Sequence, residues 1–168
     1  NLISQYIFFR LDFTAGNIYS ITRPTKKILR ALEDRVLVKV YFTKELPPEY
    51  ANNNRYLADL LSEYKTYSHG KIKVEYINPS SSKDRQNEAL QLGIPPIKFQ
   101  QITQDKYEVK EGFMGLAFLY NDKTEVIPVV KSIEGLEYDI TSRIKKLIGK
   151  ELKTIGFVTG HREATLPP

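Results

Sequence analysis

The sequence predicts an α/β fold in which helices flank a mixed β-sheet. Runs of β-branched and aromatic residues, typical of strands, alternate with stretches that have the period of an amphipathic helix. The two clearest strands, at 36–42 and 72–77, are separated by a helical stretch, and two segments that read as hairpins follow them. A chain of 168 residues is long enough to bury a core around such a sheet.

The first elements lead into the strand at 36–42. The stretch 6–13 is apolar without a helical period, so we interpret it as a strand or as the end of a longer element. Thr22 is a residue that can cap a helix, with Pro24 in the first turn. The apolar residues that follow fall on one face, and we expect this helix to end at Asp34.

The middle of the chain continues with a longer helix and a second strand. Leucines and a tyrosine predict a helix over 54–67 with one buried stripe, and Gly70 is its expected stop. After the strand at 72–77, the run 78–82 is typical of a turn followed by an N-cap. A short helix is expected from 84 to 92.

The later part holds two predicted hairpins and a last helix. The first hairpin joins strands at 97–103 and 107–111, with its turn at Gln104 and Asp105. The second joins 113–120 to 124–130. A helix over 133–148 follows, and its isoleucines and leucine lie on one face.

This order of elements is thioredoxin-like, but the redox chemistry is absent. In a thioredoxin the reactive cysteines follow the first strand, where a helix N-terminus stabilises a thiolate. Here the turn 43–48 reads Thr-Lys-Glu-Leu-Pro-Pro, and the chain contains no cysteine. Redox activity is therefore excluded, and binding remains as the function of such a fold.

Charge and motifs give no support for an enzyme, a metal site or a cofactor. The net charge of +5 is spread along the chain and interleaved with acids, so nucleic acid is not an expected partner. His69 and His161 are isolated, and no metal-ligand, nucleophile or phosphate-loop motif is present. Carboxylate pairs such as Glu134 and Glu137 are expected on a solvated helix face.

The densest basic cluster lies on and just after the last predicted helix. We interpret it as a solvated face, with an anionic membrane surface or an acidic partner as the alternative. The cluster consists of Arg143, Lys145, Lys146, Lys150 and Lys153.

Two proline-rich segments are the candidate protein-binding residues. One is the turn Glu45, Leu46, Pro47 and Pro48, and the other is Ile94, Pro95 and Pro96. The second segment follows a helix stop and precedes a strand, where thioredoxin-like folds carry a cis proline beside a peptide-binding groove. We therefore expect a cis Ile94–Pro95 bond next to the 43–48 turn, with an ordinary trans turn as the alternative.

The order and spacing of short motifs along nearly the whole chain resemble the auxiliary proteins of bacterial ABC transporters, the family typified by the gliding-motility component GldG. One departure is Arg162, where the family usually has glycine. The matching segments are Arg10-Leu11-Asp12-Phe13-Thr14, Ile18-Tyr19-Ser20-Ile21-Thr22, Thr25 to Lys27, Val38 to Pro48, Leu60 to Tyr64, Lys71 to Pro79, Leu92 to Pro96, Leu136 to Ile140, Ile144 to Leu147, and Ile155 to His161.

The resemblance implies a non-catalytic accessory domain of an ABC-type transport or gliding-motility system. Its partners would be permease or ATPase subunits, and it would lie on the periplasmic side of the inner membrane, tethered to it in the full-length protein. The alternative is a peptide- or carbohydrate-binding module that works without a transporter.

Three segments are expected from this resemblance. Residues 1–22 would be membrane-proximal, 23–152 would form the thioredoxin-like domain, and 153–168 would begin a second domain. The apolar strand at 154–158 would lack its neighbours, so we expect it to pair with a second copy of the chain in a homodimer.

Overall fold

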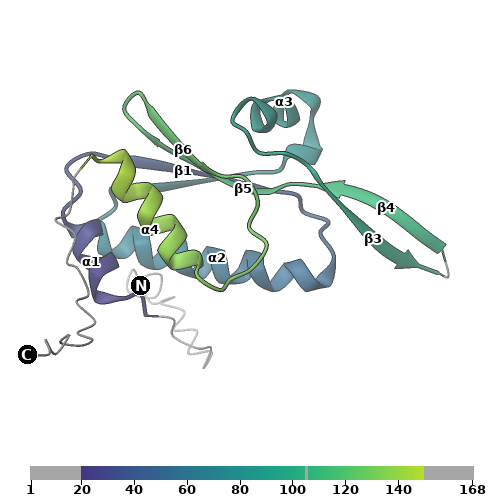
Figure 1. The fold of residues 1–168 in the computed structure, drawn as a ribbon, viewed down its shortest axis with the longest axis horizontal. Coiled ribbons are helices and arrows are strands. Elements are labelled where there is room, and N and C mark those ends of the chain that lie inside the picture. The colour runs from purple at the N-terminus through teal and green to yellow at the C-terminus, as the bar shows by residue number, and fades with distance from the viewer. Residues whose placement is uncertain (1–19, 105, 150–168) are drawn as a thin grey trace, which may run out of the picture.

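A computed structural model describes residues 20–104 and 106–149 of the chain (Figure 1). The strands expected at 6–13 and 154–158 lie outside these residues, as do His161 and Arg162. The boundaries of the first and third expected segments therefore stay predictions.

The centre of the fold is a four-stranded mixed sheet in the order β2-β1-β5-β6. Strands β1 (Val36–Phe42) and β2 (Ile72–Ile77) are parallel. Strand β5 (Met114–Tyr120) is antiparallel to β1, and β6 (Lys123–Ile127) is antiparallel to β5. The bounds of β1 and β2 are those that the hydrophobic pattern predicts.

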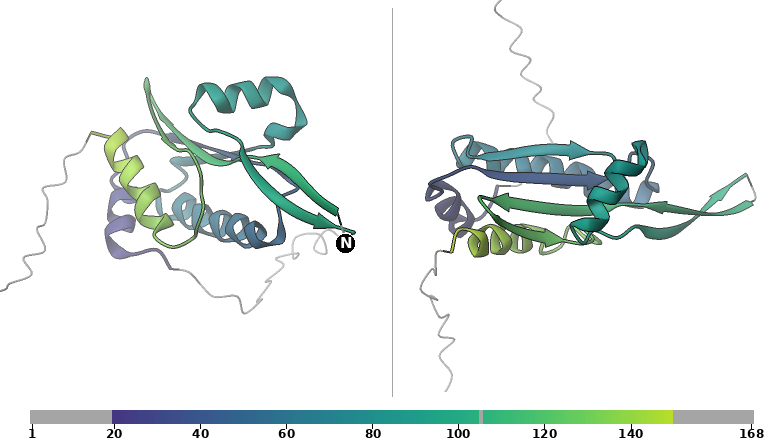
Figure 2. Two further views of the ribbon diagram at one scale, coloured as in Figure 1. Left: turned by 45° about the vertical axis from the view of Figure 1, so that its right-hand side comes forward. Right: turned by 90° about the horizontal axis from the view of Figure 1, so that it is seen from above.

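Helices cover both faces of this sheet, so the predicted mixed sheet flanked by helices is confirmed. Helices α1 (Arg23–Arg30), α2 (Pro48–Tyr67) and α4 (Leu136–Leu147) lie on one face (Figure 1). A short 3-10 helix, η1 (Pro79–Ser81), and α3 (Lys83–Gln91) lead across to the other face, which α3 covers (Figure 2).

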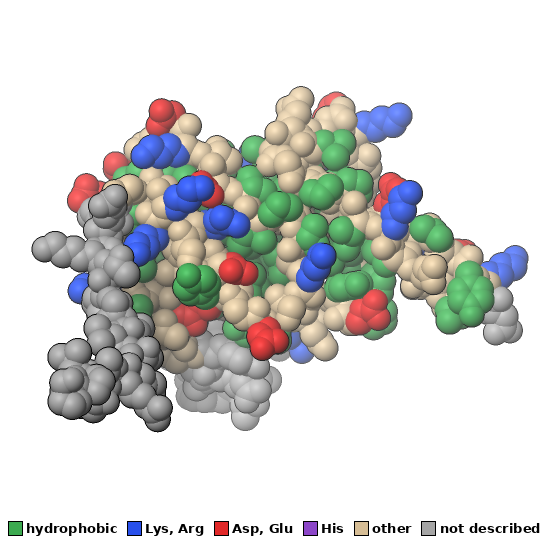
Figure 3. Space-filling model, viewed as in Figure 1, with side chains coloured by type: hydrophobic (Ala, Val, Ile, Leu, Met, Phe, Trp, Pro, Cys, Tyr) green, Lys and Arg blue, Asp and Glu red, His purple; other side chains and the backbone are tan. Residues whose placement is uncertain are grey.

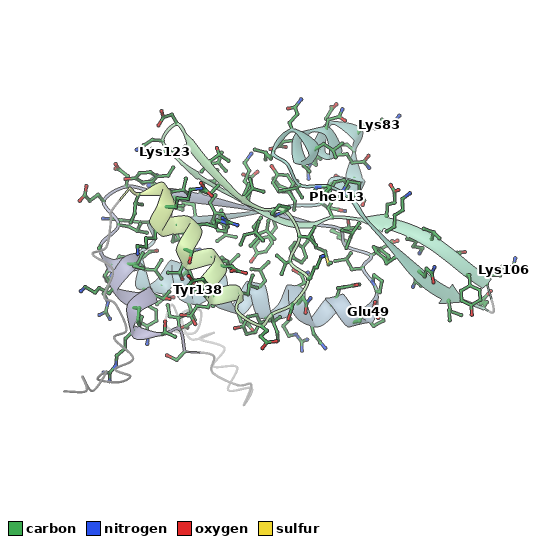
Figure 4. The ribbon with its side chains drawn as sticks, in the orientation of Figure 1. Glu49, Lys83, Lys106, Phe113, Lys123 and Tyr138 are labelled. Atoms are coloured by element: carbon green, nitrogen blue, oxygen red, sulfur yellow. The ribbon has the colours of Figure 1, made fainter. Side chains whose placement is uncertain are left out.

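A two-stranded hairpin projects from the end of the sheet. Its strands are β3 (Ile97–Thr103) and β4 (Lys106–Gly112), and they pair only with each other among the described strands. Figures 1 and 2 show the hairpin extending beyond the helices, and Lys106 lies near its far end (Figure 4). The predicted hairpin is confirmed, with a strand boundary one residue earlier at Lys106.

Two hydrophobic cores follow from this layering. The larger lies between the sheet and α1, α2 and α4, and it contains the whole predicted stripe of α2: Leu57, Leu60, Leu61 and Tyr64. The smaller lies under α3 and consists of Tyr41, Ile77, Ala89, Ile94, Phe113 and Ala117. Strand β5 contributes to both cores because alternate residues of a strand point to opposite faces.

Helix bounds differ from the sequence prediction by a few residues. Helix α2 begins at Pro48 rather than at residue 54, with proline in the first turn, where its missing N–H costs nothing. The polar first turns have no apolar period, but Asn53 is buried and its side-chain amide donates to the Lys131 carbonyl at 3.3 Å. That tertiary contact holds the part of α2 that the apolar pattern misses.

The start of α1 is bound to α4 through one carboxylate. Thr22 occupies the N-cap position, but its hydroxyl makes no cap bond and instead donates to Glu137 Oε1 at 2.7 Å. The Thr22 N–H and the Thr25 hydroxyl donate to the same oxygen at 2.8 and 2.7 Å. The expectation that Glu137 is simply solvated is therefore wrong, because it joins two helices.

Candidate functional site

The first predicted binding segment forms the entry to α2. Glu45 and Pro48 are exposed, Leu46 is half-buried against the larger core, and Pro47 is buried. A Cβ built on Gly112 would lie 3.0 Å from Leu46 Cδ2, so Leu46 packs beside the base of the hairpin.

The second predicted segment connects α3 to β3. Ile94 is fully buried in the smaller core, Pro95 is exposed and Pro96 is half-buried. The described residues contain no cis peptide bond, so the expected cis Ile94–Pro95 bond is wrong. Gly93 reverses the chain with a φ of 82°, and the Ile94 N–H donates to the Ala89 carbonyl at 2.9 Å, so the chain enters β3 with a trans proline.

The two segments meet the same junction from opposite faces of the sheet. Leu46 lies by Gly112 on the side of α2, whereas Ile94 lies by Gly115 on the side of α3. Phe113 lies between Gly112 and Gly115 in the chain (Figure 4). Its backbone N–H donates to the Thr43 hydroxyl at 2.9 Å. The structure thus brings both segments close in the fold without placing Leu46 and Ile94 on one surface.

The projecting hairpin has one face that packs and one that is exposed. On the first face, Phe99 is buried and its ring lies 6.4 Å from that of Tyr50. On the second face Ile102 stands directly opposite Tyr107, and Val109 follows two residues along. These three side chains are 67%, 79% and 65% exposed (Figure 3).

We call Ile102, Tyr107 and Val109 the hairpin patch. The sequence interpretation found both strands but did not single out these residues as candidates. The sequence does contain a pattern that could have indicated them. In 106–112, Tyr107 and Val109 alternate with charged residues, so both apolar side chains fall on one face of the strand. What the pattern could not show is that the patch extends beyond the helices.

A cleft of about 360 Å³ lies beyond the carboxyl ends of the parallel strands β1 and β2, and we call it the strand-end cleft. Its walls come from β1 and the turn after it, α2, the end of β2, η1 and α3. The lining residues are Val40, Phe42, Thr43, Lys44, Asn54, Tyr76, Ile77, Asn78, Ser81 and Arg85.

A cluster of polar side chains joins α3 to strand β1. Lys39 and the Tyr41 hydroxyl both donate to Glu88 Oε1 at 2.7 Å. These bonds, that of Lys39 first, lower the pKa of Glu88, while burial and the bond to Glu88 raise the pKa of Tyr41. The hydrogen bonds that contribute to both shifts also hold α3 against β1.

Basic side chains gather on α1 and α4. A shallow hollow of about 570 Å³ is lined by Arg23, Lys26, Lys27, Arg30 and Ala31, with Lys26 and Arg30 at 4.5 and 5.6 Å from the centre of the Tyr67 ring. On α4, Lys146 and Arg143 lie 2.7 and 3.7 Å from the Glu125 carboxylate. Lys150 and Lys153 of the predicted basic cluster lie outside the described residues.

The described residues contain neither a metal-binding cluster nor a membrane-spanning helix. Over 20–104 and 106–149, no three histidine or acidic side chains stand close enough together to hold a metal ion. In the same part of the chain, no helix has both the length and the apolar character that crossing a membrane requires.

Comparison with known proteins gives one family and one relative. A curated protein of Borreliella burgdorferi, described as "Uncharacterized protein", is 26% identical over 153 residues, which are 90% of this chain and 30% of that protein. No solved structure matches the chain. The family model described as "Domain of unknown function (DUF7088)" matches residues 15–119. Because this match covers more than half of the chain and spans β1 to β5, the chain belongs to the DUF7088 family.

Proposed function

We propose that this chain is a non-catalytic, protein-binding accessory domain of a bacterial ABC-type transport or gliding-motility system. It would act outside the cytoplasm, next to permease or ATPase subunits, in a protein tethered to the inner membrane. The order of motifs that resembles the GldG-like auxiliary proteins supports the choice of system. The exposed hairpin patch supports protein binding as the way in which the domain acts.

The observation that carries the proposal is the exposure of the hairpin patch. Single exposed apolar residues are ordinary on protein surfaces, but adjacent ones on a projecting element are typical of interaction sites. Ile102 and Tyr107 are cross-strand neighbours, and both are more than two-thirds exposed. Tyrosine is also enriched among the residues that dominate binding energy at protein interfaces.

The thioredoxin-like arrangement is part of this proposal. Strands β1 and β2 are parallel and joined through α2, and β5 runs antiparallel between β1 and β6. The turn at 43–48 follows β1 and leads into the N-terminus of α2, which is where a thioredoxin has its cysteines. Since no cysteine is present, a domain of this shape would retain binding without redox catalysis.

The test compares two exposed tyrosines in the full-length protein. Tyr107→Ala removes the centre of the hairpin patch, and Tyr138→Ala removes a side chain of α4 that is 76% exposed and distant from it (Figure 4). We expect transporter subunits to co-purify from membranes with wild type and with Tyr138→Ala, and to be lost or reduced with Tyr107→Ala. Equal recovery with both variants, or no transporter subunit with wild type, would contradict the proposal.

A further inference from the structure

We infer that the strand-end cleft binds a carboxylate group carried on an apolar or aromatic body. This inference concerns a site separate from the hairpin patch and does not rest on the function proposed above. It follows from the position of the cleft, from its unpaired hydrogen-bond donors and from its apolar wall.

The position is the one at which α/β sheets bind ligands. In open α/β sheets, ligands occupy crevices beyond the carboxyl ends of the parallel strands, because the loops that diverge there leave room between them. Strands β1 and β2 are the parallel pair of this sheet, and their ends supply Phe42, Lys44 and Ile77 to the cleft. The volume of about 360 Å³ is enough for a small ligand or for one or two side chains of a peptide.

Three solvent-exposed residues with side-chain donors, from three elements, line this cleft. Lys44 follows β1, Asn54 lies on α2 and Arg85 lies on α3. Within the described part of the chain, none of their side chains has a hydrogen bond or an ion pair. Lys44 and Arg85 are both cationic, so the cleft offers two charged donors to an anion.

Three other polar side chains of the cleft, those of Thr43, Asn78 and Ser81, are already hydrogen-bonded. The Thr43 hydroxyl accepts from the Phe113 N–H at 2.9 Å and lies 3.1 Å from the Ser80 hydroxyl. The Asn78 side chain accepts from the Ser80 N–H at 3.2 Å, and the Ser81 hydroxyl donates to the Asn78 carbonyl at 2.8 Å. These bonds fix the three side chains in place, whereas Lys44, Asn54 and Arg85 have donors that remain available to a ligand.

The charge of the cleft is positive. None of its lining residues is acidic, although the chain has 20 acidic residues. On α3, Asp84 is adjacent to Arg85 in the sequence and Glu88 lies one turn further on, and Arg85 is among the charges that lower the pKa of Glu88. Neither carboxylate forms a hydrogen bond or a close ion pair with the Arg85 guanidinium, so its fork of donors is open to the two oxygens of a carboxylate.

The apolar wall is the reason to choose a carboxylate on an apolar body over a bare inorganic anion. Val40 and Phe42 are buried on the α2 side of the sheet and Ile77 is buried on the α3 side, and all three border the cleft at the strand ends. Beside them the Tyr76 ring is 57% exposed, so a ring or alkyl group could pack on it. A ligand of this kind would be the C-terminal residue of a peptide or a small aromatic acid.

The first experiment measures the contribution of the carboxylate to binding separately from that of the apolar body. N-acetyl-phenylalanine, its C-terminal amide and inorganic phosphate would each be titrated into the labelled full chain while backbone amide NMR shifts are followed. We expect saturable shifts around 40–44, 54 and 76–85 with the acid, and binding at least tenfold weaker with the amide and with phosphate. Equal binding of acid and amide, or shifts centred elsewhere, would overturn the inference.

The second experiment tests the donors with neutral variants of similar length. Arg85→Gln and Lys44→Gln should each weaken binding of N-acetyl-phenylalanine by about tenfold, since each removes a charged hydrogen bond. Lys83→Gln is the matched control, because Lys83 is an exposed cation at the start of the same helix but does not line the cleft (Figure 4). Wild-type affinity in Arg85→Gln and Lys44→Gln, or an equal loss in Lys83→Gln, would contradict the assignment.

Discussion

The four-stranded sheet and the projecting hairpin are built from similar strands but differ in burial. All but the last two residues of β5 are buried, whereas β4 is exposed over most of its length. The difference comes from their neighbours, because β5 lies between β1 and β6 with helices on both faces, and β4 has only β3 beside it. Whether a strand residue is buried therefore depends on the elements packed around its strand. Since little packs around the hairpin, its apolar side chains are available as a binding surface.

The largest expected difference concerns aromatic side chains. Phe118→Ala should lower the free energy of unfolding by about 3–5 kcal/mol, because Phe118 is fully buried between β1 and β6 and its loss leaves a cavity. Tyr107→Ala should change it by less than about 0.5 kcal/mol, because the side chain is 79% exposed. Denaturant unfolding measures both, and a comparable loss in Tyr107→Ala would remove the distinction between sheet and hairpin.

Glycines on either side of the hairpin base provide the next comparison. A Cβ at Gly115 would lie 2.4 Å from Ile94 Cγ2 and 2.7 Å from the Pro128 carbonyl oxygen, so Gly115→Ala should cost about 1–3 kcal/mol of stability. At Gly112 the closest contacts are 3.0 Å, to the ends of the Leu46 and Phe99 side chains and not to backbone atoms. Gly112→Ala should cost less than Gly115→Ala in thermal unfolding, and the reverse order would show that the hairpin base is the tighter region.

The hydroxyl groups of a buried and an exposed tyrosine provide a third comparison between the core and the hairpin. The Tyr64 hydroxyl donates to the Glu137 carbonyl at 3.0 Å and lies 2.5 Å from the Thr141 hydroxyl, and burial raises the pKa of Tyr64. Tyr64→Phe should lower stability by about 1 kcal/mol, since it removes the hydrogen bonds of a hydroxyl that joins α2 to α4. Tyr107→Phe removes an exposed hydroxyl, and chemical unfolding should show no measurable change.

Ion pairs give the smallest expected effect, which depends on pH. Because the bond from Lys39 and then that from Tyr41 lower the pKa of Glu88, its charged form stabilises the fold above the ordinary glutamate pKa of about 4.3. That contribution is lost as the pH falls from there through the lower folded value. Glu88 is 39% exposed, so we expect it to be below about 1 kcal/mol.

The matching variants are Glu88→Gln and Glu111→Gln, followed by stability against pH. Glu88→Gln should flatten the acid limb of the curve. Glu111→Gln should leave it unchanged, because Glu111 lies 3.7 Å from Lys98 in an exposed pair on the hairpin. An identical acid limb in wild type and Glu88→Gln would show that the α3 contact contributes nothing to folding.

The sequence by itself determined most of the local structure. The alternating and continuous apolar runs predict β1 and β2 with their observed bounds, and the leucine stripe predicts the buried face of α2. These signals are local, because strand pleating and helical periodicity repeat within a few residues. The lack of cysteine likewise means that these 168 residues contain no thiol that could act as a thioredoxin's cysteines do.

The tertiary structure alone decided how distant residues come together. It placed Leu46 and Ile94 on opposite faces of the sheet, and it gave a trans bond before Pro95. Because nothing in the chain marks which strand edge lacks a neighbour, only the packing of the helices exposes the hairpin patch. The strand-end cleft depends in the same way on Lys44, Asn54 and Arg85, which belong to three elements and share no local pattern, so their approach is set by the long-range packing of the sheet.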